Sequence, residues 1–243
     1  MANLSSKIGA ELIKFINTKK SVAELEHFFQ VFPGGYGEGD HFIGVSVPNQ
    51  RKVANLLFTI MEIDELEQEL NSPIHEHRLT ALFILVKKFE KAKILEAKAE
   101  IGQLYLNNLR GVNNWDLVDS SAPYISGPYL HSTGKNETLH SLAQSQNVWE
   151  QRVAMLSCFY YIRQFEFEHP IKIATLLLNH KHDLIHKAVG WMLREIGNRD
   201  LAAELAFLEV HADRMPRTML RYAIEKFPEE LRQEFLKRGA KRR

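Results

Sequence analysis

The chain has 243 residues, of which 45% are hydrophobic and 25% charged, and its formal net charge at pH 7 is +1. This composition excludes a disordered or fibrous protein, and the length is sufficient for a large buried core. The small net charge conceals an asymmetry, because residues 148–243 hold 17 Lys and Arg against 13 Asp and Glu, whereas residues 1–147 hold 14 against 17.

The N-terminal segment MANLSSKIGAELIKF lacks the apolar core of a signal peptide, and the longest apolar run, ALFILV, has six residues. The single cysteine, Cys158, lies in the apolar stretch AMLSCFYYI, where we expect a buried structural thiol. A lone cysteine also excludes a disulfide within the chain. These features predict a cytoplasmic protein without a membrane span.

Apolar residues recur at helical spacing in nearly every long segment. The first two examples along the chain are Ile8, Leu12, Phe15 and Ile16, followed by Val53, Leu56, Leu57 and Ile60. Alternating, strand-like runs are short, and the best of them, FIGVSV, is closed by Pro48. We therefore predict an all-α chain of roughly a dozen helices.

A glycine-rich stretch, FPGGYGEGDHF, follows the first helical segments. It lacks the Lys-Ser/Thr pair of a phosphate-binding loop and does not open a dinucleotide-binding fold. We interpret it as a flexible connector to the helices that follow. Tyr36 at its centre is a candidate ligand contact, because an aromatic side chain in a loop often has a binding role.

Two histidine-containing motifs have simple structural interpretations. The segment HEHR at residues 75–78 is interpreted as the solvated start of a helix. In HKHDLIH, His182 and His186 are four residues apart, but Asp183 stands where a zinc protease has Glu, and no third ligand follows. We therefore expect no metal and assign Asp183 as a helix N-cap. Neither a nucleophile elbow nor a cofactor motif is present, so we expect no acyl transfer and no cofactor.

The openings of several apolar helices are regularly spaced. The residues that mark them are Arg78, Trp115, Arg152, Lys187 and Arg221, at intervals of 37, 37, 35 and 34 residues. This period is typical of the helix pairs in HEAT-like or armadillo-like repeats. We predict an α-α solenoid of antiparallel helix pairs whose second helices line a concave surface.

The predicted chain is a single helical-repeat domain covering residues 1–243. Its N-terminal helices and glycine-rich connector occupy residues 1–50, the repeats occupy residues 51–235, and a basic tail occupies residues 236–243.

The segment GVNNWDLVDSSAP contains the most informative pair of side chains. Trp115 and Asp119 are four residues apart, so in a helix they share one face. Asn113 and Asn114 before them are expected to be ordinary caps. A lone Trp is usually part of a core, and an Asp near two asparagines is usually another cap. Display of the pair at the surface is the alternative.

The repeat period predicts which other side chains lie at the same level as Trp115 and Asp119. It places Trp115 and Arg152 on adjacent repeats, with Trp191 one helical turn beyond Lys187. A carboxylate, a guanidinium and two indoles would then lie at one level of the predicted concave surface, where they suit an extended anionic partner.

The sequence resembles the AlkD-type alkylpurine DNA glycosylases, a HEAT-like-repeat family of bacterial DNA repair. The resemblance is carried by the segments NNWDLVD, RVAML, KAVGWMLRE and RTMLRYAIEKF. An upstream segment, YGEGDHFIGVSVPNQRK, is similar to the N-terminal region of that family. The resemblance spans residues 20–230. It implies a monofunctional glycosylase that removes N3- and N7-alkylated, positively charged purines, such as 3-methyladenine and 7-methylguanine, from duplex DNA without flipping the base into a pocket. The enzyme would act as a monomer at the bacterial nucleoid.

The resemblance also implies roles for four side chains. Asp119 would be the catalytic carboxylate, Trp115 and Trp191 would be aromatic walls beside the sugar, and Arg152 would lie near Asp119 and a phosphate. Our candidates for further DNA contacts are Arg51, Arg152, Lys187, Arg194, Arg217 and Arg221, together with Arg78 and Tyr36. Two alternatives remain: a noncatalytic binder of DNA structure, and a protein-interaction scaffold.

Overall fold

The structure is a computed structural model that describes residues 6–16 and 22–238. Within these ranges the regular secondary structure is helical, apart from an isolated bridge between His41 and Ile74. The predicted all-α class is confirmed for this part of the chain. None of its helices has the length and apolarity needed to cross a bilayer.

The chain divides into two compact units, Met1–Ile125 and Ser126–Arg243. The arrangement of all the repeats in one domain stays a prediction. Of the predicted basic tail at residues 236–243, residues 239–243 lie outside the described part of the chain.

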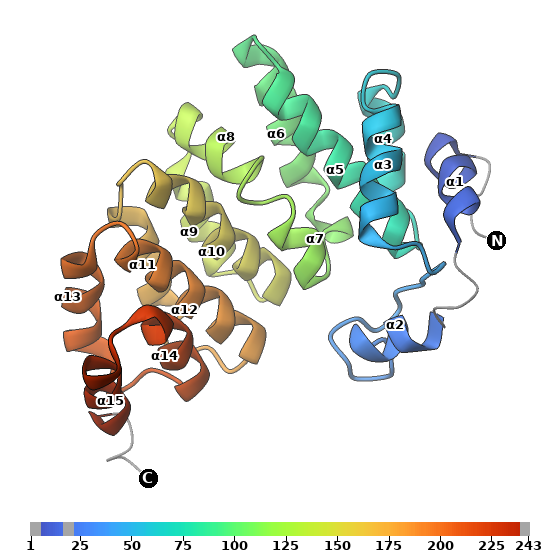
Figure 1. The fold of residues 1–243 in the computed structure, drawn as a ribbon. Helices are drawn as coiled ribbons and strands as arrows, with labels where there is room; N and C mark the ends of the chain where they lie inside the picture. The colour runs from blue at the N-terminus through green and yellow to red at the C-terminus, as the bar shows by residue number, and fades with distance from the viewer. Residues whose placement is uncertain (1–5, 17–21, 239–243) are drawn as a thin grey trace. The chain divides into compact units, whose positions relative to one another are not determined.

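The first unit is organised around its longest helix, α5 (Figure 1). Its helices are α1 (Lys7–Leu12), α2 (Val22–Phe28), α3 (Val47–Leu57), α4 (Ile63–Leu70), α5 (His75–Lys91), α6 (Leu95–Asn107) and α7 (Trp115–Asp119). Helix α5 packs against α3, α4, α6 and α7. Because it is surrounded in this way, its middle is apolar on nearly every side, and Leu79, Leu82 and Leu85 are all buried.

Local signals in the sequence explain where these helices begin. The hydroxyl of Ser6 accepts a hydrogen bond from the backbone N–H of Gly9 and caps α1. Pro48 occupies the first turn of α3, where no intrahelical N–H is needed. Glu62 and Glu65 form a reciprocal capping box at the start of α4.

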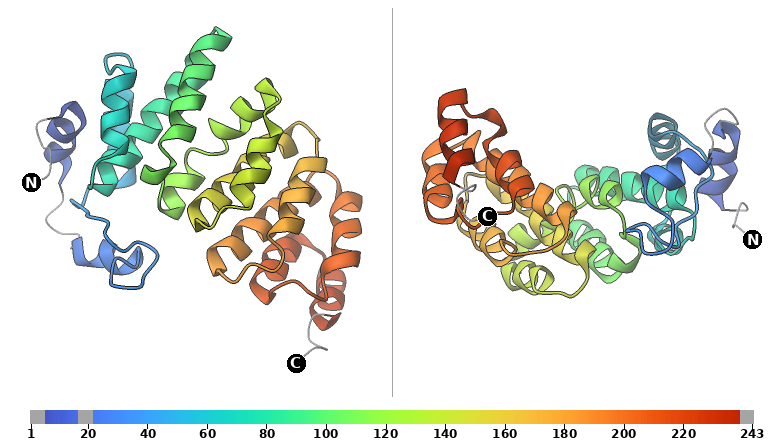
Figure 2. Two further views of the ribbon diagram at one scale, coloured as in Figure 1. Left: turned by 180° about the vertical axis from the view of Figure 1, so that it is seen from behind. Right: turned by 90° about the horizontal axis from the view of Figure 1, so that it is seen from below.

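The second unit consists of stacked helices. They are α8 (Ser126–Thr133), α9 (Asn136–Ala143), α10 (Val148–Arg163), α11 (Glu168–Leu176), α12 (Asp183–Gly197), α13 (Leu201–His211), α14 (Arg217–Ala223) and α15 (Glu229–Arg238). Helices α8, α10, α12 and α14 pack against one another in that order, while α9, α11 and α13 pack beside them (Figure 2). Within this unit the arrangement fits the stacked helix pairs that the repeat period predicts.

Two glycines allow close approach of neighbouring helices in this stack. A Cβ atom on Gly127 of α8 would lie 2.5 Å from the Ser157 carbonyl oxygen of α10. One on Gly190 of α12 would lie 2.4 Å from the Met219 carbonyl oxygen of α14. Any side chain at either position would therefore push two stacked helices apart. Cys158 is fully buried in α10, as predicted for a structural thiol.

The five residues that marked the repeat period fall in five different helices. They are Arg78 in α5, Trp115 in α7, Arg152 in α10, Lys187 in α12 and Arg221 in α14. Each lies at the first residue or within the first five residues of its helix. The spacing therefore placed each marker residue near the start of a different helix.

Candidate functional site

Helix α7 carries Trp115 and Asp119 at its two ends. The side chain of Asn114 accepts a hydrogen bond from the backbone N–H of Trp115 at 2.8 Å, which confirms Asn114 as the N-cap. Trp115 and Asp119 are both half-buried, so neither is a core residue. The helix therefore presents an indole and a carboxylate, one turn apart, at the border between core and solvent.

The Trp115 indole is held by aromatic rings from the N-terminal part of the chain. Phe29 stacks on it with ring centroids 5.4 Å apart, and Phe28 meets it edge-on at 5.9 Å. Phe29 also stacks on Phe42 at 4.9 Å. These contacts hold the plane of the indole.

A buried ionic network lies beneath α7. His75, the first residue of α5, bonds through Nδ1 to Asp40 and through Nε2 to Asp116, each at 2.8 Å. Arg78 bonds to the other carboxylate oxygen of Asp40. The network therefore joins α5 and α7 to the loop that contains Asp40.

The guanidinium of Arg78 also donates to three oxygens of the surrounding loops. It reaches the carbonyl oxygens of Ser72 at 2.8 Å and Gly111 at 3.1 Å, and the Asn113 side-chain oxygen at 3.1 Å. Asn113 is therefore a partner of Arg78, and its assignment as a simple cap is wrong. Arg78 itself is 4% exposed, so a DNA contact at this side chain would need these hydrogen bonds to be replaced, and that role stays a prediction.

The segment HEHR is buried throughout, so its interpretation as a solvated helix start is wrong. Each of its side chains has a partner inside the protein. The carboxylate of Glu76 accepts hydrogen bonds from the backbone N–H groups of Ile43, Gly44 and Val45. His77 bonds to Glu69 at 2.9 Å. Long-range partners compensate the burial of these polar groups, and a local pattern does not reveal them.

The environment of His75 favours its charged form. Burial of the imidazole acts to lower its pKa, but the charge of Asp116 and hydrogen bonds to Asp116 and Asp40 outweigh burial and raise the pKa to about 9. Burial likewise acts to raise the pKa of Asp40, and the contacts with His75 and Arg78 reverse this and lower it. The shifts of His75 and Asp40 therefore both favour the charged form of the side chain.

This network predicts a pH dependence of folding stability. The folded protein holds the His75 proton up to a pKa of about 9, whereas the unfolded chain releases it near 6.5. The stabilisation is therefore complete below pH 6.5 and is lost as the pH rises through about 9. Urea unfolding between these values should show a falling free energy of unfolding that is absent from His75→Gln. The same decline in both proteins would contradict this account.

The glycine-rich stretch is held by hydrogen bonds and is more than the connector we expected. Gly34 and Gly39 adopt positive φ angles of 81° and 86°, which favour glycine. The backbone N–H of Gly34 bonds to the Glu38 carboxylate, and the Tyr36 hydroxyl donates to the Phe28 carbonyl oxygen at 3.1 Å. Asp40 lies near the end of this stretch, which therefore positions its carboxylate in the buried network.

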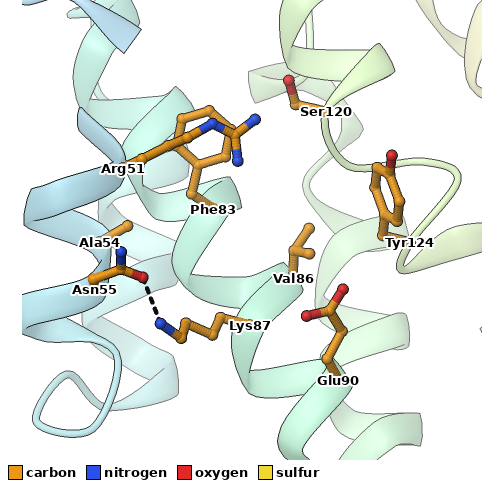
Figure 3. Close-up of a pocket in the computed structure, with 9 residues that line it drawn as sticks. All are labelled: Arg51, Ala54, Asn55, Phe83, Val86, Lys87, Glu90, Ser120 and Tyr124. Carbon is orange, nitrogen blue, oxygen red and sulfur yellow. Dashed lines mark hydrogen bonds between the residues drawn. The ribbon is translucent and has the colours of Figure 1, made fainter. Parts of the chain in front are cut away.

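A groove of about 350 Å³ begins next to the end of α7 (Figure 3). Its lining residues are Arg51, Ala54, Asn55, Phe83, Val86, Lys87, Glu90, Ser120 and Tyr124. The guanidinium of Arg51 lies over the Phe83 ring, 4.0 Å from its centroid, and Lys87 bonds to Asn55. Ser120, the residue that follows Asp119 in the chain, lines this groove together with the charged side chains of Arg51, Lys87 and Glu90.

The predicted site residues of the second unit have partners of their own. Arg152 is 5% exposed in α10 and donates to the Leu184 carbonyl oxygen of α12. Trp191 is half-buried in α12, and its indole N–H donates to Glu195 at 3.3 Å. Their roles toward DNA stay predictions.

The remaining predicted DNA contacts differ in their exposure. Lys187 pairs with Asp183 at 2.9 Å, Arg194 pairs with Glu225, and Arg217 donates to the Leu236 carbonyl oxygen. The side chains of Arg51 and Arg221 are exposed. A phosphate would reach these two with the smallest rearrangement of existing contacts.

The cap of α12 differs from the prediction. His182 is the N-cap, and its Nδ1 accepts from the backbone N–H of Leu184 at 3.2 Å. Asp183 is instead the first helical residue, where its negative charge is favourable in the helix dipole. Its assignment as the cap was therefore one residue out of register.

Sequence reasoning missed Phe29, Asp40, His75 and Glu76. The available signal was a run of four polar residues, HEHR, directly before the apolar segment LTALFILV. Charged residues at the start of a fully buried helix need internal partners. The identity of those partners was not visible in the sequence.

Comparison with known proteins agrees with the fold. No curated protein sequence matches the chain. Among solved structures, a protein described as a predicted DNA alkylation repair enzyme from Enterococcus faecalis shares 15% identity, with a TM-score of 0.68 over 88% of this chain and 98% of that chain. AlkD2 from Streptococcus mutans shares 16% identity, with a TM-score of 0.49 over 93% of this chain and 99% of that chain.

The sequence profile of the family described as "DNA alkylation repair enzyme" matches residues 8–227. This range covers most of both compact units and all the segments on which the resemblance depended. The chain belongs to the DNA alkylation repair enzyme family.

Proposed function

We propose that this protein is a monofunctional DNA glycosylase that hydrolyses the N-glycosidic bond of N3- and N7-alkylated purines in duplex DNA. Membership of the DNA alkylation repair family supports a DNA substrate. The observation that carries the finer proposal is the pair on α7, where Trp115 and Asp119 are both half-buried and the next residue, Ser120, lines a groove that contains Arg51. An action at the nucleoid is part of the same proposal.

The chemistry requires a carboxylate and little else from the protein. An alkylated purine is already cationic, so it leaves as a neutral base with the electron pair of the broken bond and needs no general acid. The sugar becomes oxocarbenium-like as the bond breaks. Asp119 would stabilise that positive charge and orient a water molecule whose oxygen bonds to the anomeric carbon as one proton is released.

The indole of Trp115 would contribute to the same step. Its face carries negative potential and attracts a cationic group. Phe29 stacks on Trp115, which leaves the ring rigid before DNA binds. Rigid groups lose little conformational entropy on binding and exclude water, which strengthens the field of the neighbouring carboxylate.

Arg152 and Trp191 keep their implied roles as parts of the proposal. Arg152 would contact a phosphate, and Trp191 would be a second aromatic wall. Such an enzyme would act without enclosing the base in a pocket. It would therefore depend on the lability of the lesion itself, which restricts it to cationic purines.

The direct test measures purine release from duplex DNA treated with a methylating agent, beside duplex DNA that contains uracil. Release of 3-methyladenine or 7-methylguanine, without release of uracil, supports the proposal. Binding to the DNA without release identifies a noncatalytic DNA binder, and absence of both identifies a scaffold. Release of uracil would contradict the dependence on a cationic leaving group.

Phosphate binding at the groove gives a separate prediction. Arg51→Ala should weaken binding to alkylated and unmodified DNA to a similar extent, because phosphates carry no lesion. The slope of log K against log salt concentration should fall by about 1. Fluorescence anisotropy over a salt series measures both quantities.

Lys52→Ala is the matched control, because it removes an equal charge from the adjacent position of α3. The Lys52 ammonium lies 5.9 Å from the Phe15 ring and bonds to Asn49, outside the set of groove residues. Equal effects of the two substitutions, or an effect of Arg51→Ala on alkylated DNA alone, would contradict a phosphate contact in the groove.

A further inference from the structure

One buried side chain connects the glycine-rich loop to the helix that carries Asp119. Asp40 lies at the end of that loop, His75 opens α5, and Asp116 is the second residue of α7. The imidazole bonds to both carboxylates at 2.8 Å, and it is 1% exposed. Asp116 directly follows Trp115 and is three residues before Asp119, so this contact acts on the first turn of α7.

We propose that His75 is a positioning residue for the reaction: as an imidazolium clamped between Asp40 and Asp116, it sets the orientation in which α7 presents Asp119. This proposal rests on the proposed glycosylase function. It assigns a role to a buried side chain that the chemistry at Asp119 does not itself use.

Helix α7 needs external contacts to hold its direction. It spans only Trp115–Asp119, and a helix of this length has little stability of its own. The Asn114 cap satisfies one backbone N–H at its start. The orientation of the helix axis must therefore come from tertiary contacts, among which are His75 on Asp116 and Phe29 on Trp115.

The geometry requires the charged form of the imidazole. A neutral imidazole has one N–H, so one of the two carboxylates would face a nitrogen lone pair. Only the imidazolium donates to both at once. Asp40 is balanced in turn by Arg78, and Glu76 beside His75 is engaged by the backbone N–H groups of residues 43–45.

Two aromatic rings pack on the imidazole of this clamp. Phe42 stacks on the imidazole with centroids 4.5 Å apart, and Phe29 packs against it at 5.1 Å. Both rings are buried and uncharged, so the groups of opposite charge that face His75 are Asp40 and Asp116. In such surroundings hydrogen bonds between charged groups are strong and directional. Phe29 contacts both His75 and Trp115, which couples the clamp to the indole.

The test compares two buried histidines of the same helix. His75→Gln removes the clamp, whereas His77→Gln removes an equally buried imidazole that bonds to Glu69. Under single-turnover conditions at saturating DNA, His75→Gln should reduce the rate of purine release by about 10- to 100-fold, because a small displacement of a catalytic group has this effect. The Kd for DNA should stay within about threefold. His77→Gln should leave both quantities near wild type.

A second variant changes the residue of α7 that bonds to His75. Asp116→Asn keeps the size of the side chain and removes its charge, so it should slow release as His75→Gln does. The double variant should be no slower than the slower single variant, because both remove the same contact. Additive losses, or a His75→Gln rate within twofold of wild type in a folded protein, would overturn the proposal.

A spectroscopic measurement separates the clamp from the proposed function. In ¹⁵N NMR spectra of the wild-type protein at pH 7.5, assigned with His75→Gln, both ring nitrogens of His75 should have the shifts of a protonated imidazolium. A neutral tautomer would overturn the clamp even in an active enzyme. Absence of purine release with a charged His75 would instead overturn the glycosylase assignment and leave the clamp as a feature of the fold.

Discussion

Replacing Asp119 with asparagine is expected to slow the release of 3-methyladenine and 7-methylguanine from duplex DNA by about 10²- to 10³-fold. The amide keeps the shape of the side chain but removes the negative charge that would face the sugar as it becomes cationic. Because that charge develops only in the transition state, the Kd for DNA should change little. Single-turnover release at saturating DNA measures the rate, and anisotropy measures the affinity.

The control for Asp119→Asn is Asp64→Asn, the same chemical change at an exposed position in the first turn of α4. It should leave both rate and affinity near wild type. A large loss of affinity with a normal release rate in Asp119→Asn would contradict the catalytic assignment. An equal loss of rate in Asp64→Asn would show that the change in net charge alone is responsible.

Replacing Arg78 with methionine is expected to lower the free energy of unfolding by about 3–5 kcal/mol. Methionine fills much of the same volume, but it leaves the Asp40 carboxylate buried with one cationic partner fewer. It also removes the donor to the carbonyl oxygens of Ser72 and Gly111. A buried polar group without its partner retains the full cost of desolvation. Urea unfolding at neutral pH measures the loss.

Two further variants make the result for Arg78 specific. Arg110→Met removes a charge from an exposed position close in sequence to Gly111, and it should change the stability by less than about 0.5 kcal/mol. Arg78→Lys keeps the charge but not the planar fork, so it should recover only part of the loss. A fully stable Arg78→Lys protein would mean that charge alone, without the directed hydrogen bonds, holds these loops.

Most of the secondary structure was predictable because helical periodicity is a local property. Of the spaced residues Val53, Leu56, Leu57 and Ile60, Val53 and Leu57 are buried in α3, whereas Leu56 is exposed and Ile60 lies beyond the end of the helix. The period of 34 to 37 residues placed its five marker residues in the first five residues of α5, α7, α10, α12 and α14. In the second unit the corresponding helices pack in succession, as a repeat requires.

The predictions for caps and charges were less reliable, for a physical reason. Several residues can cap the same helix end, so His182 rather than Asp183 caps α12. A charged residue is usually solvated, which is why HEHR was assigned to the surface. That rule fails where partners distant in sequence are available, and no local pattern reports such partners.

The sequence by itself determined that the chain is helical, that its helices recur every 34 to 37 residues, and that Trp115 and Asp119 share one turn. These properties follow from side-chain spacing along a single segment. Only the tertiary structure decided that Asp40, His75 and Asp116 form a buried clamp under that turn. Its three members are separated by 35 and 41 residues, so folding of the whole first unit brings them within hydrogen-bonding distance.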